Sequence, residues 1–224
     1  MEVTPEAADV FGDAIDQARR YAELLATDGV TRGLIGPRET ERLWDRHLVN
    51  CAVVAELLPE RGVLVDIGSG AGLPGVVLAM LHPSLRVILL EPLLRRSVFL
   101  EECVAELGLS NATVLRARAE EKAARDIKAD VATARAVAPL DRLAGWAAPL
   151  LRPGGELLAI KGQSAAEEIE AARPALSRLG GRSAEVLQAG HGRVIMATTV
   201  VRVVIEGHGR EERAGAQRSR RGVA

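Results

Sequence analysis

The sequence predicts an α/β protein in which one mostly parallel sheet is covered by helices on both faces. Three observations lead to this fold class. Short aliphatic runs alternate with amphipathic segments across residues 62–179, a pattern typical of parallel strands joined by helical crossovers. Helical periodicity alone occupies residues 1–60. Two further strand-like runs near the end lie too close together for a crossover, so we expect an antiparallel hairpin.

Two amphipathic helices are expected before the first strand. The first begins at Thr4, whose hydroxyl can cap it, and ends near Gly29. The second begins near Pro37 and carries apolar residues at helical spacing until Pro59 ends the pattern. We therefore expect an N-terminal helical extension over residues 1–60.

Seven strands are expected in the sheet, which we assign to residues 61–206. The five parallel strands are expected at residues 63–65, 87–90, 113–115, 130–132 and 157–160. The helices that follow these strands are expected at residues 74–81, 95–107, 140–151 and 165–179. The closing hairpin is expected to pair residues 182–188 with residues 193–205.

Composition and charge narrow the possible functions. With 224 residues, of which 48% are hydrophobic, the chain can form one sizeable domain with an extension. No apolar run approaches the roughly 20 residues that span a bilayer, and the N-terminus lacks the features of a secretion signal, so we expect a cytoplasmic protein. The net charge of -1 argues against a surface that binds nucleic acid everywhere, and we expect no DNA partner. A local basic patch is compatible with this net charge.

The C-terminal segment and the two cysteines do not indicate a catalytic group. Residues 207–224 combine five arginines with few apolar residues, and we expect a disordered basic tail, or simply a solvated terminus without a partner. Cys51 and Cys103 have no further cysteine or histidine set at metal-ligand spacing. We expect buried free thiols and no metal site.

The sharpest local feature is the segment 65–75, which reads VDIGSGAGLPG. Its glycines allow a sharp turn after a strand and the close approach of a ligand, and the next helix offers unpaired N–H groups. Gly68, Gly70 and Gly72 are therefore expected to cradle a nucleoside-bearing ligand. Residues 70–75 also fit the G-x-G-x-x-G fingerprint, which leaves a dinucleotide-binding oxidoreductase as an alternative.

Two observations favour S-adenosylmethionine over a dinucleotide. Asp66 directly precedes the glycines in the D-x-G-x-G-x-G form typical of methyltransferases, and a carboxylate suits the positive charge of this cofactor. Helices precede the first strand, whereas dinucleotide domains usually open with that strand. Glu91 closes the second strand, where an acid can accept hydrogen bonds from the ribose of either cofactor. The plain alternative for Glu91 is a surface acid in a turn.

Five segments in their joint order resemble the bacterial ribosomal RNA small subunit methyltransferase G family, also called glucose-inhibited division protein B. They are residues 43–48 (LWDRHL), 65–75, 118–121 (RAEE), 134–138 (ARAVA) and 158–162 (LAIKG). The resemblance implies the class I S-adenosylmethionine-dependent methyltransferase fold, which is Rossmann-like. It also implies methyl transfer to N7 of one guanine in 16S ribosomal RNA, free or in the small-subunit particle, with S-adenosylhomocysteine as the second product. We expect a monomer.

The resemblance implies roles for individual residues as well. Gly68 and Leu73 would line the cofactor site, and Ala119 with Glu120 would hold the adenine. Arg135 would reach the cofactor or the target base, and we expect it to orient that base.

RNA-facing roles are implied for Arg46, His47 and Lys161. Their plain alternatives are a solvated helix charge, an interfacial histidine and a strand-end lysine. The chain departs from the family pattern at residues 50–51, which read NC in place of DS, and at residues 33–36, which read GLIG. These departures concern RNA docking rather than the cofactor site.

No general base is expected, because guanine N7 carries an unprotonated lone pair at neutral pH. This agrees with a sequence that has no Ser-His-Asp set, metal cluster or paired carboxylates. Two other classes remain as alternatives. One is a methyltransferase of this fold acting on a small molecule or a protein, and the other is a nucleotide-binding regulatory module without turnover.

Overall fold

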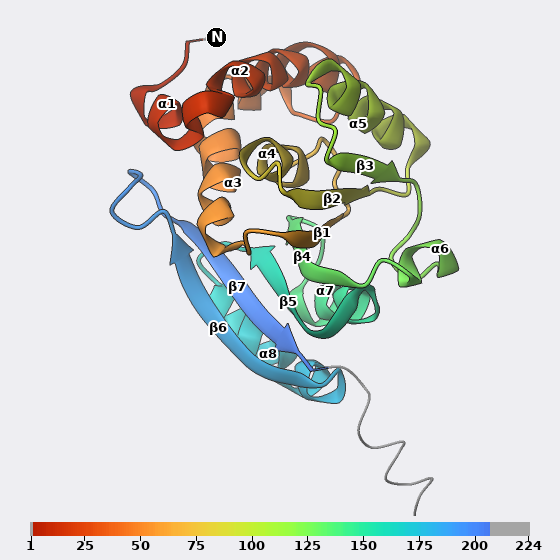
Figure 1. Ribbon diagram of the computed structural model, residues 1–224. Helices are drawn as coiled ribbons and strands as arrows, with labels where there is room; N and C mark the ends of the chain where they lie inside the picture. Colours follow the sequence, from red (N-terminus) through yellow and green to blue (C-terminus); the bar gives the residue numbers. More distant parts are fainter. Residues whose placement is uncertain (1, 207–224) are drawn as a thin grey trace, which may run out of the picture.

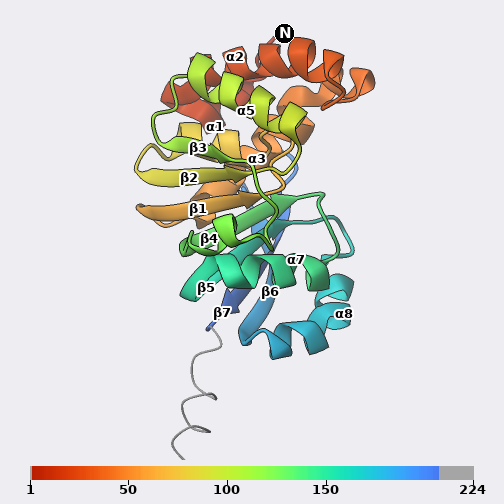
Figure 2. The same ribbon diagram turned by 90° about the vertical axis from the view of Figure 1, so that its right-hand side faces the viewer.

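The computed structural model describes residues 2–206 and contains one seven-stranded sheet between two layers of helices (Figures 1 and 2). The strand order is β3-β2-β1-β4-β5-β7-β6. The pairs among β1 to β5 are parallel, and β7 is antiparallel to both β5 and β6. The predicted fold class, including the closing hairpin, is confirmed. The predicted basic tail lies outside the described residues.

The sheet and its crossover helices begin after residue 61. The strands are β1 (Gly62–Ile67), β2 (Leu85–Leu90), β3 (Ala112–Leu115), β4 (Ala129–Arg135), β5 (Leu151–Ile160), β6 (Gly181–Ala189) and β7 (Thr198–Ile205). The helices are α4 (Gly75–Leu81), α5 (Leu94–Glu106), α6 (Lys122–Arg125), α7 (Leu140–Ala147) and α8 (Ala165–Arg178), with a 3-10 turn at Ala148–Leu150.

The N-terminal extension is less regular than the two continuous helices that the sequence predicts. Its elements are α1 (Pro5–Phe11), a 3-10 turn (Gly12–Ala14), α2 (Ile15–Leu24), a π turn (Leu25–Gly29), a 3-10 segment (Pro37–Arg42), a π segment (Leu43–Val49), α3 (Asn50–Ala52) and a 3-10 turn (Val53–Leu57). Thr4 caps α1 as predicted, since its Oγ1 accepts the N–H of Ala7 at 3.1 Å. Gly12, with φ of +49°, interrupts the first helix.

The π segment Leu43–Val49 buries an apolar face. Leu43, Trp44, Leu48 and Val49 are all buried, and they repeat at intervals of five residues. Trp44 and Leu48 are also four residues apart, so this pattern fits an α-helix as well as the i→i+5 hydrogen bonds of a π-helix. The apolar pattern therefore predicts a helix here, but not its wider turn.

Three boundaries in the second half differ from the prediction. β5 begins at Leu151 rather than 157, because residues 151–156 continue the strand past a register shift opposite β4, and α7 accordingly ends at Ala147. β7 begins at Thr198 rather than 193. The N–H groups of Arg193 and Val194 both bond the carbonyl of Gly190, so this segment turns instead of pairing. The short helix α6 was not predicted.

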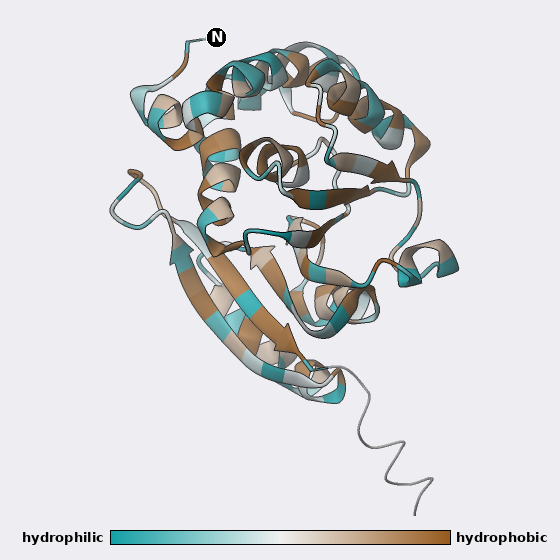
Figure 3. Ribbon diagram, viewed as in Figure 1, coloured by the Kyte–Doolittle hydropathy of each residue, from teal (hydrophilic) through white to brown (hydrophobic). Residues whose placement is uncertain are grey.

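The two faces of the sheet carry separate apolar clusters. Alternating residues of β1 illustrate this, because Leu64 belongs to the cluster that includes the extension, α4 and α5, whereas Val65 belongs to the cluster with α7 and α8. Figure 3 shows the hydrophobic residues concentrated along the strands. In the described part of the chain, no helix has both the length and the apolar character needed to cross a membrane.

Candidate active site

A cavity of about 970 Å³ opens at the carboxyl ends of β1, β2, β4 and β5. Ligands of open α/β sheets bind at this edge, at the point where the strand order reverses. Here that point lies between β1 and β4. The walls come from both parts of the chain. The sheet domain contributes Gly68–Ala71, Leu73, Glu91–Leu93, Arg96, Arg118, Arg135–Val137, Ile160–Gly162 and Glu168, and the extension contributes Leu34, Ile35, Arg46, His47 and Asn50.

The glycine loop adopts a backbone that side chains would hinder. Gly68, Gly70 and Gly72 have φ of +68°, +58° and +97°, in the region that favours glycine. A Cβ at Gly72 would lie 2.6 Å from the hydroxyl of Tyr21. The N–H of Gly68 bonds the carbonyl of Leu90 at 2.8 Å, which folds the loop against the end of β2. The loop therefore exposes backbone to the cavity, as a cradle for a ligand requires.

Glu91 lies at the end of β2, as predicted, and faces the glycine loop. Its side chain is buried, and its carboxylate accepts the N–H of Gly70 at 3.0 Å and that of Leu93 at 2.9 Å. The guanidinium of Arg96 lies 3.9 Å away. A carboxylate held in this way keeps free lone pairs for a hydroxyl donor in the cavity.

Asp66 does not reach the cavity wall. Its Oδ2 accepts the N–H of Gly75 at 3.0 Å beneath the loop, and its buried Oδ1 has no hydrogen-bond partner among the described residues. Burial raises the pKa of this carboxyl to about 7. The geometry assigns Asp66 a place under the loop at the start of α4. Gly72 likewise lies behind the wall, and direct cofactor contact for both stays a prediction.

The structure brings Arg135 and His47 together. Arg135 ends β4, and its Nη2 lies 2.9 Å from Nδ1 of His47, while its Nη1 lies 3.4 Å from the carbonyl of Arg46. On the other side of the ring, Nε2 of His47 lies 2.8 Å from a carboxylate oxygen of Glu39. The next residue, Ala136, has φ of +55°, a strained value for a non-glycine residue. The extension and β4 thus meet at the cavity wall.

Lys161 also lines the cavity, but its ammonium group already has partners. The Nζ atom donates to the carbonyl of Ala138 at 2.8 Å and to the carboxylate of Glu168 at 2.7 Å. The same carboxylate oxygen accepts the N–H of Leu140. Lys161 therefore connects the end of β5 to α8 and to the segment after β4, and an RNA-facing role stays a prediction.

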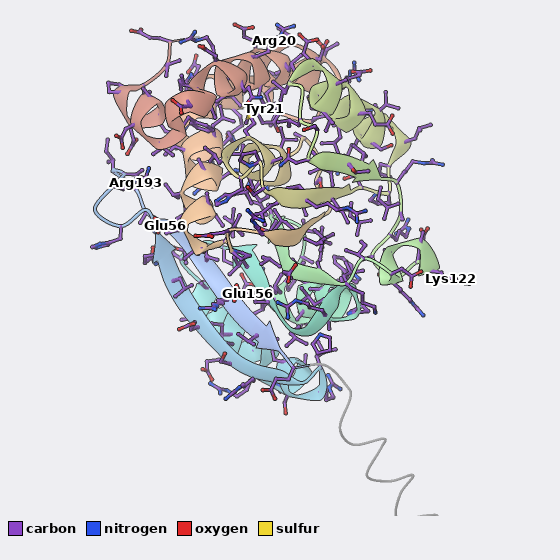
Figure 4. All side chains as sticks on the ribbon, viewed as in Figure 1. Arg20, Tyr21, Glu56, Lys122, Glu156 and Arg193 are labelled. Atoms are coloured by element: carbon purple, nitrogen blue, oxygen red, sulfur yellow. The ribbon has the colours of Figure 1, made fainter. Side chains whose placement is uncertain are left out.

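Ala119 and Glu120 lie in the turn between β3 and α6, and neither lines the cavity. Their neighbour Arg118 does. The sequence patterns did not indicate a site role for Arg118, nor for Tyr21, whose hydroxyl donates to the carbonyl of Ala71 at 2.6 Å. Figure 4 labels Tyr21 beneath the N-terminal helices. One signal pointed to it, since a tyrosine on a buried apolar stripe needs a partner for its hydroxyl.

The charge of the wall is mostly positive. Its basic residues are Arg46, Arg96, Arg118, Arg135 and Lys161, and its acidic residues are Glu91 and Glu168. Among residues 2–206, no three His, Cys, Asp or Glu side chains lie close enough together to hold a metal ion. The arrangement suits a ligand with a nucleoside part beside the glycine loop and an anionic partner opposite it.

Comparison with known proteins points to one family. The model of a family described as rRNA small subunit methyltransferase G matches residues 14–196. The chain is 60% identical to ribosomal RNA small subunit methyltransferase G of Thermobifida fusca, over 89% of this chain and 84% of the relative. It is 57% identical to the protein of that name from Streptomyces coelicolor, over 91% and 85%.

Solved structures agree at the level of the fold. The SAM-dependent O-methyltransferase of Thermotoga maritima has a TM-score of 0.56 and 16% identity, over 77% of this chain and 72% of that one. The sheet order and the glycine loop thus define a class I S-adenosylmethionine-dependent methyltransferase fold. Within that class, the chain belongs to the rRNA small subunit methyltransferase G family. This family decides against the dinucleotide alternative that the glycine loop alone left open.

Proposed function

We propose that this protein transfers the methyl group of S-adenosylmethionine to N7 of one guanine in 16S ribosomal RNA. One observation supports this most directly: the cavity joins the glycine loop and Glu91 to a basic wall that includes Arg135. The first part suits a nucleoside with a ribose, and the second suits RNA. We also infer that the protein acts as a monomer in the cytoplasm, where its RNA substrate is made.

The residues of the loop fit S-adenosylmethionine. Gly68 and Gly70 line the cavity without a side chain, and the Glu91 carboxylate beside them would accept a hydrogen bond from a ribose hydroxyl. When bound, this group supplies a methyl carbon attached to a positively charged sulfur. Direct contacts of Leu73, and of Ala119 and Glu120 with the adenine, are part of the proposal.

The protein's own contribution is positioning. Attack by N7 forms a carbon–nitrogen bond while the carbon–sulfur bond breaks, so positive charge moves from sulfur to the purine and no proton leaves first. Arg135 is proposed to orient the guanine through its O6 atom or a neighbouring phosphate, both of which accept hydrogen bonds from a guanidinium. Catalysis then depends on holding nucleophile, carbon and sulfur in line.

The activity can be tested directly. Purified protein is incubated with donor labelled in its methyl group and with small-subunit RNA, free or in particles, from cells that lack this modification. We expect label at N7 of one guanine, located by digestion and mass spectrometry. Label at another atom or on no RNA would exclude the proposed specificity. Calorimetric titrations with S-adenosylmethionine and with NAD serve as the cofactor control, and only the former is expected to bind.

A further inference from the structure

Three side chains form a hydrogen-bonded series that begins in the extension and ends at the cavity. Glu39 lies in the 3-10 segment Pro37–Arg42, His47 in the π segment Leu43–Val49, and Arg135 at the end of β4. Glu39 contacts Nε2 of His47 at 2.8 Å, and Arg135 contacts Nδ1 at 2.9 Å. The His47 side chain is only 12% exposed, so water does not readily replace these partners.

The chemistry of arginine fixes the state of the histidine. A guanidinium has donors and no acceptor, so Nδ1 of His47 must accept the hydrogen bond from Arg135 and cannot carry a proton. Nε2 then carries the proton of the neutral ring and donates it to the Glu39 carboxylate. This series therefore exists only with a neutral His47 in the Nε2–H tautomer.

We propose that Glu39 and His47 are positioning residues, which hold the Arg135 guanidinium at the cavity wall as long as His47 is neutral. This inference rests on the proposed role of Arg135 toward the guanine. Among the described residues, the only other hydrogen bond of the Arg135 side chain is the longer one to the Arg46 carbonyl, at 3.4 Å. Without the ring nitrogen, the guanidinium is free to leave the orientation that the substrate requires.

The charges around His47 predict a dependence on pH. The charged groups that face the ring are Arg135 of β4, Glu39 of the 3-10 segment and Arg46 of its own segment. Burial and the Arg135 charge lower the pKa of His47, although Glu39 opposes them. Below this pKa, a proton on Nδ1 faces the guanidinium and the contact is lost. We expect the methylation rate to fall on the acid side for this reason.

Three variants test the inference. Glu39→Ala removes the partner of Nε2, Glu39→Gln keeps an acceptor oxygen but removes the charge, and Glu41→Ala is the matched control. Glu41 is an exposed glutamate of the same 3-10 segment, and no ion pair of its side chain is found among the described residues. Rates are measured from pH 5.5 to 8.5 with RNA substrate, together with the Kd for the methyl donor and the thermal midpoint.

We expect Glu39→Ala to lower kcat/KM for RNA about tenfold, while the donor Kd changes less than about twofold. Glu39→Gln should shift the acid limb of the rate profile to lower pH, because the charge that favours protonated His47 is gone. A purely structural role would lower the thermal midpoint without moving that limb. The inference would be overturned if the acid limb of the rate profile did not move in Glu39→Gln. It would also be overturned if Glu39→Ala and Glu41→Ala had equal rates.

A second readout does not depend on activity. Nitrogen-15 NMR of labelled histidines, with His47 assigned by the loss of its signals in His47→Gln, reports which ring nitrogen carries the proton. We expect Nε2 protonated and Nδ1 bare at pH 7.5, and the reverse would refute the series. If wild-type protein shows this tautomer but methylates no RNA, the proposed function fails while the series stands. If it methylates RNA with Nδ1 protonated, only the series fails.

Discussion

At the scale of single residues, Asp66 carries the clearest conflict between burial and charge. Its side chain is fully enclosed, one oxygen has no partner among the described residues, and the pKa is raised to about 7. A carboxyl whose pKa is higher in the folded than in the unfolded protein favours the protonated form. Its stabilising contribution is complete below about pH 4 and is lost as the pH rises toward 7.

Substitution of Asp66 tests this balance. Asp66→Asn keeps an oxygen that can accept the N–H of Gly75 and removes the titration. Relative to this variant, the wild type should lose up to about 1.4 kcal/mol of unfolding free energy per pH unit between pH 4 and 7. Urea unfolding of the ligand-free proteins at several pH values measures the difference. A difference that does not change with pH would contradict the expectation.

At the scale of elements, helix α2 holds the glycine loop through Tyr21. The ring is completely buried, and burial raises the pKa of the phenol well above its usual range, so the hydroxyl remains a donor to the Ala71 carbonyl. Ala71 lines the cavity, and its neighbour Gly72 leaves room for the phenol oxygen. The extension therefore shapes one wall of the cofactor cradle from behind.

Removing this hydroxyl should weaken donor binding. We expect Tyr21→Phe to lower the unfolding free energy by about 1–2 kcal/mol, because a buried carbonyl loses its donor, and to raise the Kd for S-adenosylmethionine several-fold. Phe11→Leu is the control, since Phe11 is buried in the extension against Trp44. It should cost similar stability with an unchanged Kd. Equal Kd values for both variants and the wild type would rule out the coupling. Calorimetry supplies both measurements.

The sequence predicts those parts of the site that depend on parallel strands. Gly68, Glu91 and Arg135 lie at the carboxyl ends of separate strands, and these ends share one edge of the sheet, so their convergence on one cavity was predictable. Contacts between elements that are distant in the sequence were not predictable. Glu39 reaches His47 through irregular turns, and the pairing of Lys161 depends on how α8 packs, which local patterns do not encode.

Boundaries were mispredicted where the local pattern stayed apolar but the hydrogen bonds changed. Residues 193–197 read RVIMA, an apolar run like that of a strand, yet the carbonyl of Gly190 accepts two of their N–H groups, and Glu6 accepts that of Ile195. Gly190 packs against Val53 of the extension, where a Cβ would lie 2.7 Å from a methyl group. The turn is therefore set by a tertiary contact that no window of sequence contains.

At the scale of the whole molecule, the extension and the sheet share one apolar core. One cluster contains Leu25 and Leu48 of the extension together with Leu64 of β1 and Leu89 of β2, all of them fully buried. Separating residues 1–60 from residues 61–206 would expose this face of the sheet to water, at roughly 25 cal/mol per Å² of apolar surface. We therefore expect residues 1–60 and the sheet to unfold together.

The two tryptophans allow this unity to be measured. Trp44 is buried in the extension, and Trp146 lies on α7 on the opposite side of the sheet. In Trp146→Phe the remaining Trp44 reports on the extension, and in Trp44→Phe the remaining Trp146 reports on the layer of α7. Replacing Trp44 breaks no hydrogen bond of its Nε1, which has no partner within residues 2–206. We expect the fluorescence and far-ultraviolet circular dichroism midpoints in urea to coincide within each variant, because the extension and the sheet share one apolar cluster. An earlier transition of Trp44 than of the circular dichroism would instead mean that the extension detaches first, and the glycine loop would then lose its Tyr21 contact before the sheet unfolds.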